Sequence, residues 1–248
     1  MKRTLWISLL AIFAFAIILL VRLPVQWVAG FLPKNVSCAQ LAGTAWEGSC
    51  GGLVARGLQI GNLTWELHPL ALVSGKISVD VDVMRGTSFV RAEVESTFSG
   101  AKITARNVQA DMPLDRALIP QLPPGLSGNA RLNLVMIHVE NGIVTSLQGL
   151  VEAHDLVDAS GGQRTVLGDY SMTFPAADPA AEPVGQLMSL SGPLDVEGTL
   201  KLTREPGFVL EGLVAAGADA SPKLVQQLAY LGSPDAQGKR PFSVAATF

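Results

Sequence analysis

Beyond Pro33, the most regular feature of the chain is an alternation of apolar and polar residues with a period of two. Successive side chains of a β-strand point to opposite faces of its sheet, so each alternating run predicts a strand with one apolar and one polar face. Such runs occupy residues 76–83, 90–95, 101–106, 130–139 and 194–202. The sequence therefore predicts a mainly β protein whose antiparallel sheet is apolar on one face and polar on the other.

The alternation changes phase within residues 130–139, where the apolar positions shift from Met136 to Ile137. An extra residue of this kind predicts a β-bulge and a curved strand. Asn141-Gly142 lies between two strand-like runs and is the strongest hairpin signal in the chain. Two further turn signals are Arg85-Gly86 and Pro206-Gly207. Because short turns join antiparallel neighbours, we expect a strongly twisted, curved antiparallel sheet, with two stacked sheets in a sandwich as the alternative.

Helical patterns are scarce and predict one or two short helices. Ser221-Pro222 places an N-cap serine before a proline at the first helical position, and Gly232 ends the following apolar face. A shorter helical piece is expected between Pro113 and Pro120. Residues 175–183, rich in alanine and proline, are expected to form a loop or linker.

Residues 5–23 predict a transmembrane helix. The apolar run from Leu5 to Val21 is interrupted only by Ser8 and contains no charge. A cleaved secretory signal peptide is the competing interpretation, but no small-x-small cleavage site follows Arg22 before Leu32. The basic residues before the run predict a cytoplasmic amino terminus, with everything after the run across the membrane.

This orientation divides the chain into four predicted parts: a cytoplasmic tip (1–4), the transmembrane helix (5–23), a periplasmic connector (24–51) and a periplasmic β-domain (52–248). Trp6, Arg22 and Trp27 are predicted to lie at the membrane interfaces, where tryptophan and basic side chains are enriched. Ordinary packing is the alternative for both tryptophans.

The chain has two cysteines, Cys38 and Cys50. In an oxidising compartment their spacing favours a disulfide, worth about 2–3 kcal/mol by loop-closure entropy. Two unpaired thiols are the alternative. A zinc site is not expected, because His68, His138 and His154 are far apart in the sequence and show no ligand spacing.

Charge and motifs point away from several classes of function. The formal net charge is −3 and charges are scattered singly, so nucleic acid is not an expected partner. The sequence has no Gly-x-Ser-x-Gly elbow, phosphate-binding loop or His-Glu-x-x-His motif. Asp80 and Asp82 resemble a carboxylate pair, but they fit the solvated face of one strand. We expect a protein that is not an enzyme and needs no cofactor or metal.

Segments along nearly the whole chain resemble the protein N family of bacterial type II secretion systems. They are residues 23–27, 43–48, 58–75 with Trp65 to Pro69 at the centre, 190–194 and 228–248. The resemblance implies a single-pass protein of the bacterial inner membrane with a periplasmic β-rich domain. It also implies a non-enzymatic accessory of the platform that exports folded proteins across the outer membrane. Cys38 and Cys50 are not counted in the family's pattern.

Two functional hypotheses fit these observations. In the first, the anchored β-domain docks other inner-membrane subunits of the secretion platform through strand edges or loops. In the second, the apolar face holds acyl chains, as in a periplasmic lipid-binding or lipid-transfer module resembling the AsmA-like β-grooves.

Overall fold

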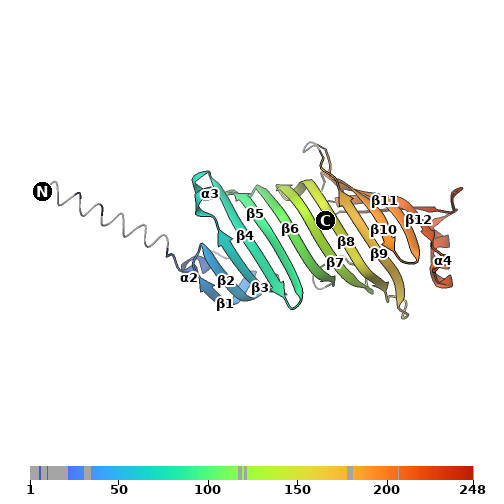
Figure 1. Ribbon diagram of the computed structural model, residues 1–248, viewed down its shortest axis with the longest axis horizontal. Helices are drawn as coiled ribbons and strands as arrows, with labels where there is room; N and C mark the ends of the chain where they lie inside the picture. Colours follow the sequence, from blue (N-terminus) through green and yellow to red (C-terminus); the bar gives the residue numbers. More distant parts are fainter. Residues whose placement is uncertain are drawn as a thin grey trace.

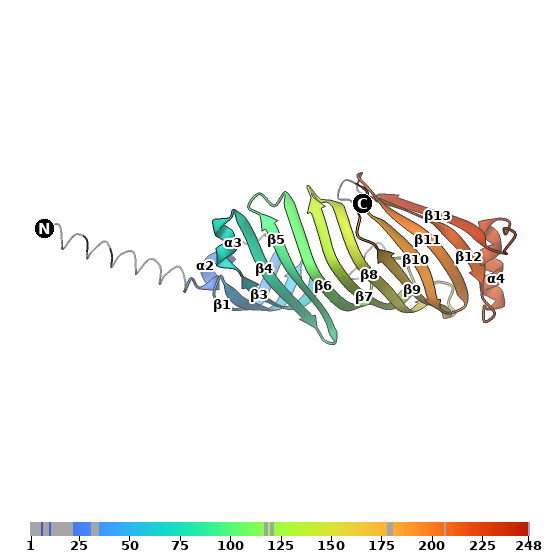
Figure 2. The ribbon, with the colours of Figure 1, turned by 45° about the horizontal axis from the view of Figure 1, so that its top comes forward.

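Thirteen strands form one antiparallel sheet in which the strand order follows the chain order from β1 to β13. The computed structural model describes Trp6, Leu10 and residues 22–30, 35–116, 119, 122–177, 181–205 and 207–247. Figures 1 and 2 show the sheet as a continuous, strongly twisted and curved layer. The expected mainly β, antiparallel architecture is confirmed, and the alternative of two stacked sheets is wrong.

The strands vary in length and the longest pair lies in the middle of the sheet. They are β1 (Val36–Gly43), β2 (Glu47–Ala55), β3 (Leu58–Leu67), β4 (Lys76–Arg85), β5 (Ser88–Thr97), β6 (Lys102–Leu114), β7 (Leu126–Glu140), β8 (Ile143–Asp158), β9 (Thr165–Phe174), β10 (Val184–Ser191), β11 (Leu194–Thr203), β12 (Gly207–Ala216) and β13 (Arg240–Thr247).

Pairing between neighbouring strands places apolar residues opposite apolar residues and polar residues opposite polar residues. In the β4–β5 ladder, Val81 lies opposite Ala92, and the next position pairs Asp82 with Arg91. A shift of one residue would turn every apolar side chain to the polar face, so the alternation fixes the register. The alternating sequence thus explains both the strands and their alignment.

The predicted bulge lies in β7. Leu134 pairs with Gly149 of β8 and Met136 pairs with Gln148, so Val135 has no counterpart on β8. On the other side of β7, Asn107 of β6 has φ 51° and the β5–β6 register also shifts there. The irregularity therefore crosses two neighbouring strands, as expected for a bend in the sheet.

Hairpin turns connect most of the strands. Asn141 (φ 52°) and Gly142 (φ 83°) join β7 to β8, as predicted. Both residues have positive φ, a combination that Asn-Gly adopts readily in a two-residue turn. Gly86 lies between β4 and β5, also as predicted, whereas Pro206 is outside the described residues.

The described helices are short: α2 (Val25–Ala29), α3 (Pro69–Val73), α4 (Pro222–Leu228) and the 3-10 turn η1 (Ala229–Leu231). α4 starts as predicted, since the Ser221 hydroxyl accepts a hydrogen bond from the Leu224 amide at 3.3 Å. Of the helical piece expected between Pro113 and Pro120, Leu114 belongs to β6 instead, and the Ile119 amide donates to the Asp115 carbonyl at 2.8 Å. Ala117 and Leu118 lie outside the described residues.

The predicted transmembrane helix, residues 5–23, lies almost entirely outside the described residues. Among the residues that the structure describes, no helix is long and apolar enough to cross a membrane. The sheet begins at Val36, so the segment predicted as a connector (24–51) contains α2, β1 and part of β2. The β-structure therefore starts earlier than the predicted boundary at residue 52.

Buried apolar side chains such as Ala110 and Leu134 lie in the middle of the sheet, and a packed cluster lies at its C-terminal end. Leu228 of α4 packs with Val196 and Val214, while half-buried apolar side chains surround this cluster: Tyr170, Leu187, Leu194 and Phe242. Burial raises the pKa of Tyr170 to about 12, with a smaller contribution from the charge of Asp169. Five strands and α4 thus converge on one apolar cluster.

Candidate interaction surfaces

One row of paired residues crosses the entire sheet on its apolar face. Each member lies opposite the next on the neighbouring strand. The row runs Leu41, Cys50, Leu63, Val83, Val90, Ala110, Leu132, Val151, Met172, Leu187, Gly198, Gly212 and Phe242. Every member is apolar or glycine, so this face is continuous from the first strand to the last. A Cβ at Gly212 would overlap the backbone carbonyl oxygen of Glu197 and lie 2.8 Å from the Phe242 ring, which explains why glycine is required there.

This face has no second sheet over it in the described part of the chain. α4 lies against β12 and contributes Leu228 to the core. Farther toward the amino terminus, apolar-face residues such as Val79, Val81 and Val83 are only half-buried. The apolar face is therefore well covered near α4 and buried at Ala110 and Leu134 of β6 and β7, and it is more accessible over β4.

The opposite face carries a polar row. Its members, again paired from strand to strand, are Ser49, Thr64, Asp82, Arg91, Gln109, Asn133, Leu150, Thr173, Gln186, Thr199, Glu211 and Ser243. All are polar except Leu150. The two faces thus differ in chemistry along almost the whole sheet.

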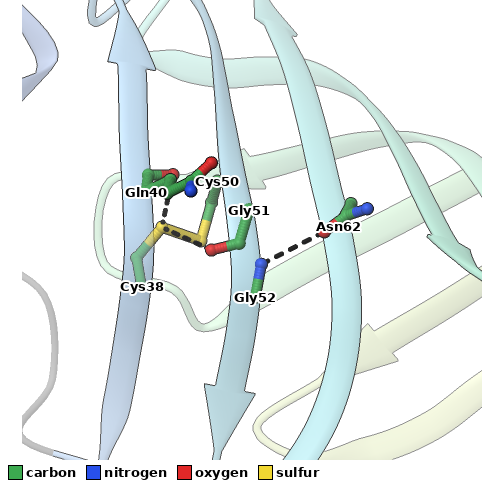
Figure 3. The surroundings of a disulfide bond; sticks show 6 residues. All are labelled: Cys38, Gln40, Cys50, Gly51, Gly52 and Asn62. Carbon is green, nitrogen blue, oxygen red and sulfur yellow. Dashed lines mark hydrogen bonds between the residues drawn. A yellow bond between two sulfur atoms is a disulfide. The ribbon is translucent and has the colours of Figure 1, made fainter.

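At the amino-terminal end, Cys38 of β1 and Cys50 of β2 form a disulfide (Figure 3), as their spacing predicted. Their Cα atoms are 5.7 Å apart. The β2–β3 register shifts just after Cys50, and the Gly52 amide donates to Asn62 Oδ1 at 3.1 Å. The bond fastens the edge strand to its neighbour beside an irregular part of the ladder.

The predicted membrane-interface residues are exposed. Trp6 is 70% exposed, Trp27 is 71% exposed and Arg22 is also exposed. Contact of these residues with a membrane stays a prediction.

Ion pairs link neighbouring strands on the polar face. Glu95 of β5 accepts from Lys76 of β4 and, at 2.9 Å, from Arg106 of β6. Hydrogen bonds, first from Lys76 and then from Arg106, lower the pKa of the Glu95 carboxyl. Such exposed pairs add little stability one by one, but Glu95 joins three successive strands.

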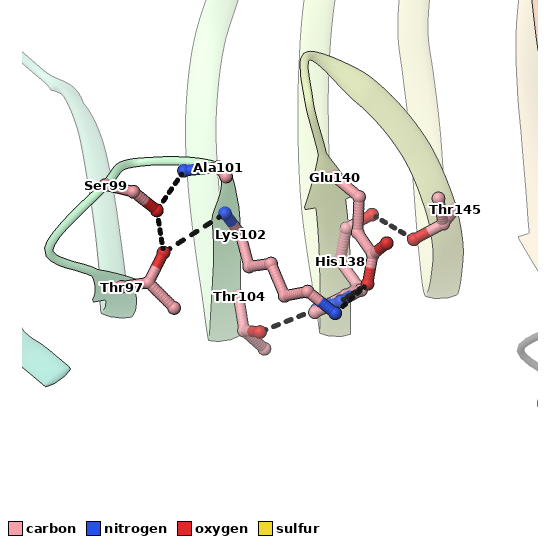
Figure 4. A network of polar contacts seen from close by, with 8 residues as sticks. All are labelled: Thr97, Ser99, Ala101, Lys102, Thr104, His138, Glu140 and Thr145. Carbon is pink, nitrogen blue, oxygen red and sulfur yellow. Dashed lines mark hydrogen bonds and ion pairs between the residues drawn. The ribbon is translucent and has the colours of Figure 1, made fainter. Parts of the chain in front are cut away.

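A second polar network lies where the β5–β6 and β7–β8 turns come together (Figure 4). Glu140 accepts from Lys102 at 2.9 Å and lies 3.2 Å from His138 Nε2. On its other side the His138 ring is hydrogen-bonded to Thr104 at 2.7 Å. Hydrogen bonds from Lys102 and then His138 lower the pKa of Glu140. The network ties two turns that are distant in the sequence.

A hollow of about 870 Å³ lies over the polar face of β1 to β6. Its charged lining consists of Glu47, Glu66, Asp80, Asp82, Glu93 and Arg91. Asp82 uses one oxygen to accept from Arg91 at 2.6 Å, and its other oxygen is buried without a hydrogen-bond partner. The described residues contain no group of three metal-ligating side chains. The hollow is thus an acidic depression on an otherwise mixed polar surface.

The two edge strands complete the set of surfaces. β1 is flanked by α2, by a bridge between Pro24 and Thr44, and by a hydrogen bond from the Ala45 amide to the Leu23 carbonyl at 2.9 Å. β13 pairs with β12 and touches η1. Within the described residues, neither edge pairs with a further strand. Unpaired edges are natural templates for strand addition.

Sequence reasoning missed two of these features. It assigned β1 and most of β2 to a connector, because the Gly-rich segment of β2 (Glu47–Ala55) interrupts the alternation. It also did not predict the ion pairs of Glu95, whose cationic partners Lys76 and Arg106 come from two other strands. The only available signal for these ion pairs was the opposite charge of residues on neighbouring predicted strands.

Comparison with known proteins gives consistent results. The family model described as type II secretion system (T2SS), protein N, matches residues 34–243. A type II secretion system protein N of Aeromonas hydrophila is 26% identical over 251 residues, spanning 97% of both chains. One of Vibrio cholerae is 25% identical over 258 residues, spanning 98% of both chains. No solved structure matches at a significant level. The matched region covers all but the last few residues of the sheet, and the chain therefore belongs to the type II secretion system protein N family.

Proposed function

We propose that this chain is a non-enzymatic accessory of the inner-membrane platform of a type II secretion system. In this proposal residues 5–23 anchor it in the inner membrane, with the amino terminus cytoplasmic and the sheet in the periplasm. The sheet then docks other platform subunits during export of folded proteins across the outer membrane. Family membership supports the pathway, and the disulfide and the exposed tryptophans agree with an anchored periplasmic protein.

The open, single-layer sheet is the observation that best supports docking. Thirteen strands in a single layer present a continuous polar face and two unpaired edges in the described part of the chain. The polar face combines an acidic hollow with ion pairs whose members are partly exposed. A surface of this shape and chemistry suits recognition of protein surfaces or extended segments.

Photocrosslinking in secretion-competent cells tests docking. A photoreactive residue replaces Gln109 or Thr199, both exposed on the polar face, in the full chain. The expected result is adducts that mass spectrometry identifies as other platform subunits, and that disappear in cells lacking those subunits. Adducts that persist without the platform, or no protein adducts from either position, would overturn the proposal.

The proposed topology has its own test. Protease added to spheroplasts should degrade the sheet, while protease added to right-side-out cells with an intact outer membrane should not. Carbonate washing should leave the full chain with the membranes. Recovery of the chain in the soluble cytosolic fraction would contradict the anchored periplasmic location.

A second candidate function, lipid binding, is favoured by the half-buried apolar face over β4. Val81 lies on that face, and its neighbour Asp82 lies on the polar face. If acyl chains occupy the apolar face, a photoreactive residue at Val81 should give phospholipid adducts and one at Asp82 should not. Equal labelling from both positions, or none from Val81, would exclude a lipid-filled face.

A further inference from the structure

β13 is the less protected of the two edges of the sheet. Its residues from Ser243 to Thr247 are all exposed, and the Val244 side chain is 49% exposed. No charged residue lies between Arg240 and Thr247. Proteins usually guard edge strands with charges, proline, bulges or a covering segment. Within β13, such devices are confined to the start of the strand, at Arg240 and Pro241.

The opposite edge is guarded by the chain itself. α2 contacts β1, and Pro24 forms a bridge with Thr44 just beyond the end of β1. The disulfide fastens β1 to β2. η1 touches β13, but from Ser243 to Thr247 this edge presents an exposed and uncharged template to an incoming strand.

The chemistry of β13 defines the strand that fits beside it. Phe242, Val244 and Ala246 continue the apolar face of the sheet, because they pair with Gly212, Leu210 and Phe208 of β12. A further strand must place apolar side chains on this same face. β13 has that pattern itself, so a second β13 in antiparallel orientation satisfies the requirement.

One register of such a pair is self-complementary. With Val244 opposite Val244 of the second copy, Phe242 lies opposite Ala246 and Ser243 lies opposite Ala245. The large ring then faces a methyl group, and no two like charges meet within the pair. Pro241 lies opposite Thr247, near the end of the ladder, where its missing N–H removes least pairing.

We propose that β13 pairs antiparallel with β13 of a second copy of this chain, about a two-fold axis at Val244. The pairing extends the apolar and polar faces continuously from one copy to the other. An eight-residue edge is a small contact, so the dimer is weak in solution. Confinement of both copies to one membrane raises their effective concentration. The pairing does not require that the chain dock other platform subunits.

Cysteine crosslinking tests the register. In the full chain in native membranes, Val244→Cys places two thiols on directly opposed residues, within the Cα separation that a disulfide needs. Ala246→Cys is the matched control, since it is exposed on the same face of the same strand. Its counterpart on the second copy lies about 13 Å farther along the ladder, too far for a disulfide.

After mild oxidation, Val244→Cys should give at least about tenfold more disulfide-linked dimer than Ala246→Cys. Equal yields would mean random collision, and absence of a Val244→Cys dimer would mean that the edges do not meet. Either result overturns the pairing. A Val244→Cys adduct with a different protein would likewise overturn it, in favour of strand addition by a partner.

A second variant separates dimerisation from folding. Val244→Lys puts a charge on an exposed edge position, so the monomer should fold while the dimer is lost. Sedimentation velocity of the purified full chain at high protein concentration should show dimers that vanish in Val244→Lys at unchanged circular dichroism. If wild type and variant have the same mass distribution, the proposal fails. Crosslinking of platform subunits from Gln109 is read separately, so failure of the dimer and failure of docking are distinguishable.

Discussion

The two ends of the sheet are stabilised in different ways. At the amino-terminal end, a covalent bond between Cys38 and Cys50 fastens the edge strand, and α2 lies beside it. At the carboxyl-terminal end, α4 covers the apolar face and places Leu228 against Val196 and Val214. The edge strand is therefore stabilised at the amino-terminal end, whereas the apolar face is covered at the carboxyl-terminal end.

The difference reflects two features of a single-layer sheet that lower its stability or solubility. Its unpaired edges invite other strands, and its apolar face is exposed to water. The amino-terminal end stabilises its edge strand, and the carboxyl-terminal end covers its apolar face. The strands between the ends combine ladder pairing, cross-strand ion pairs such as those of Glu95, and buried apolar side chains such as Ala110 and Leu134. The accessible surfaces, which are the edge at β13 and the face over β4, are therefore the places to look for partners.

The largest expected effect comes from a charge placed beneath α4. Val214 is 5% exposed, so Val214→Asp should lower the free energy of unfolding by more than about 4 kcal/mol and deplete the protein. Val81→Asp, at a half-buried position far from α4, should also destabilise the fold, but less. Urea unfolding and abundance in membranes measure both. Equal losses, or normal abundance of Val214→Asp, would contradict the contrast between covered and accessible face.

Truncation of the covering helix should have the next largest effect. Leu228→Ala removes a side chain that is 9% exposed and should cost about 2–4 kcal/mol in the free energy of unfolding. Val225→Ala on the same helix is the matched control, since Val225 is 48% exposed and should change stability by less than about 0.5 kcal/mol. Similar costs at the two positions would show that α4 does not pack as described.

Loss of the disulfide should destabilise the amino-terminal end of the sheet. Replacing both Cys38 and Cys50 by alanine should lower the free energy of unfolding by about 2–3 kcal/mol, because the unfolded chain loses a constraint. Reductant should lower the stability of the wild type by a similar amount and should leave the double variant unchanged. A wild type indifferent to reductant would show that the bond does not stabilise the fold.

The smallest expected effect is the pH dependence of stability that arises from Glu95. Lys76 and Arg106 lower the pKa of Glu95 below the ordinary value of 4.5, so the stabilising contribution is complete above that value. It is lost as the pH falls through the lowered pKa of the folded state. Stability should therefore decline below about pH 4.5, with a shallower decline in Glu95→Gln. A decline of the same slope in both proteins would assign the pH dependence to other carboxyls.

Local features of this fold could be predicted from the sequence. The alternation around Val81, the phase change after Met136 and the cap at Ser221 depend on neighbouring residues, and the structure confirms each of them. β1 and β2 were not predicted, because their Gly-rich sequence alternates poorly and they are held by pairing and a disulfide. The hollow and the uncovered edge depend on how distant strands curve, which no local pattern encodes.

Amide hydrogen exchange of the full chain most directly tests whether the two ends are stabilised differently. In the oxidised protein, β1 amides that pair with β2 should be protected, and reductant should speed their exchange while β12 and α4 stay unchanged. Exchange that accelerates equally at both ends, or β1 amides that are unprotected even with the disulfide intact, would contradict the account.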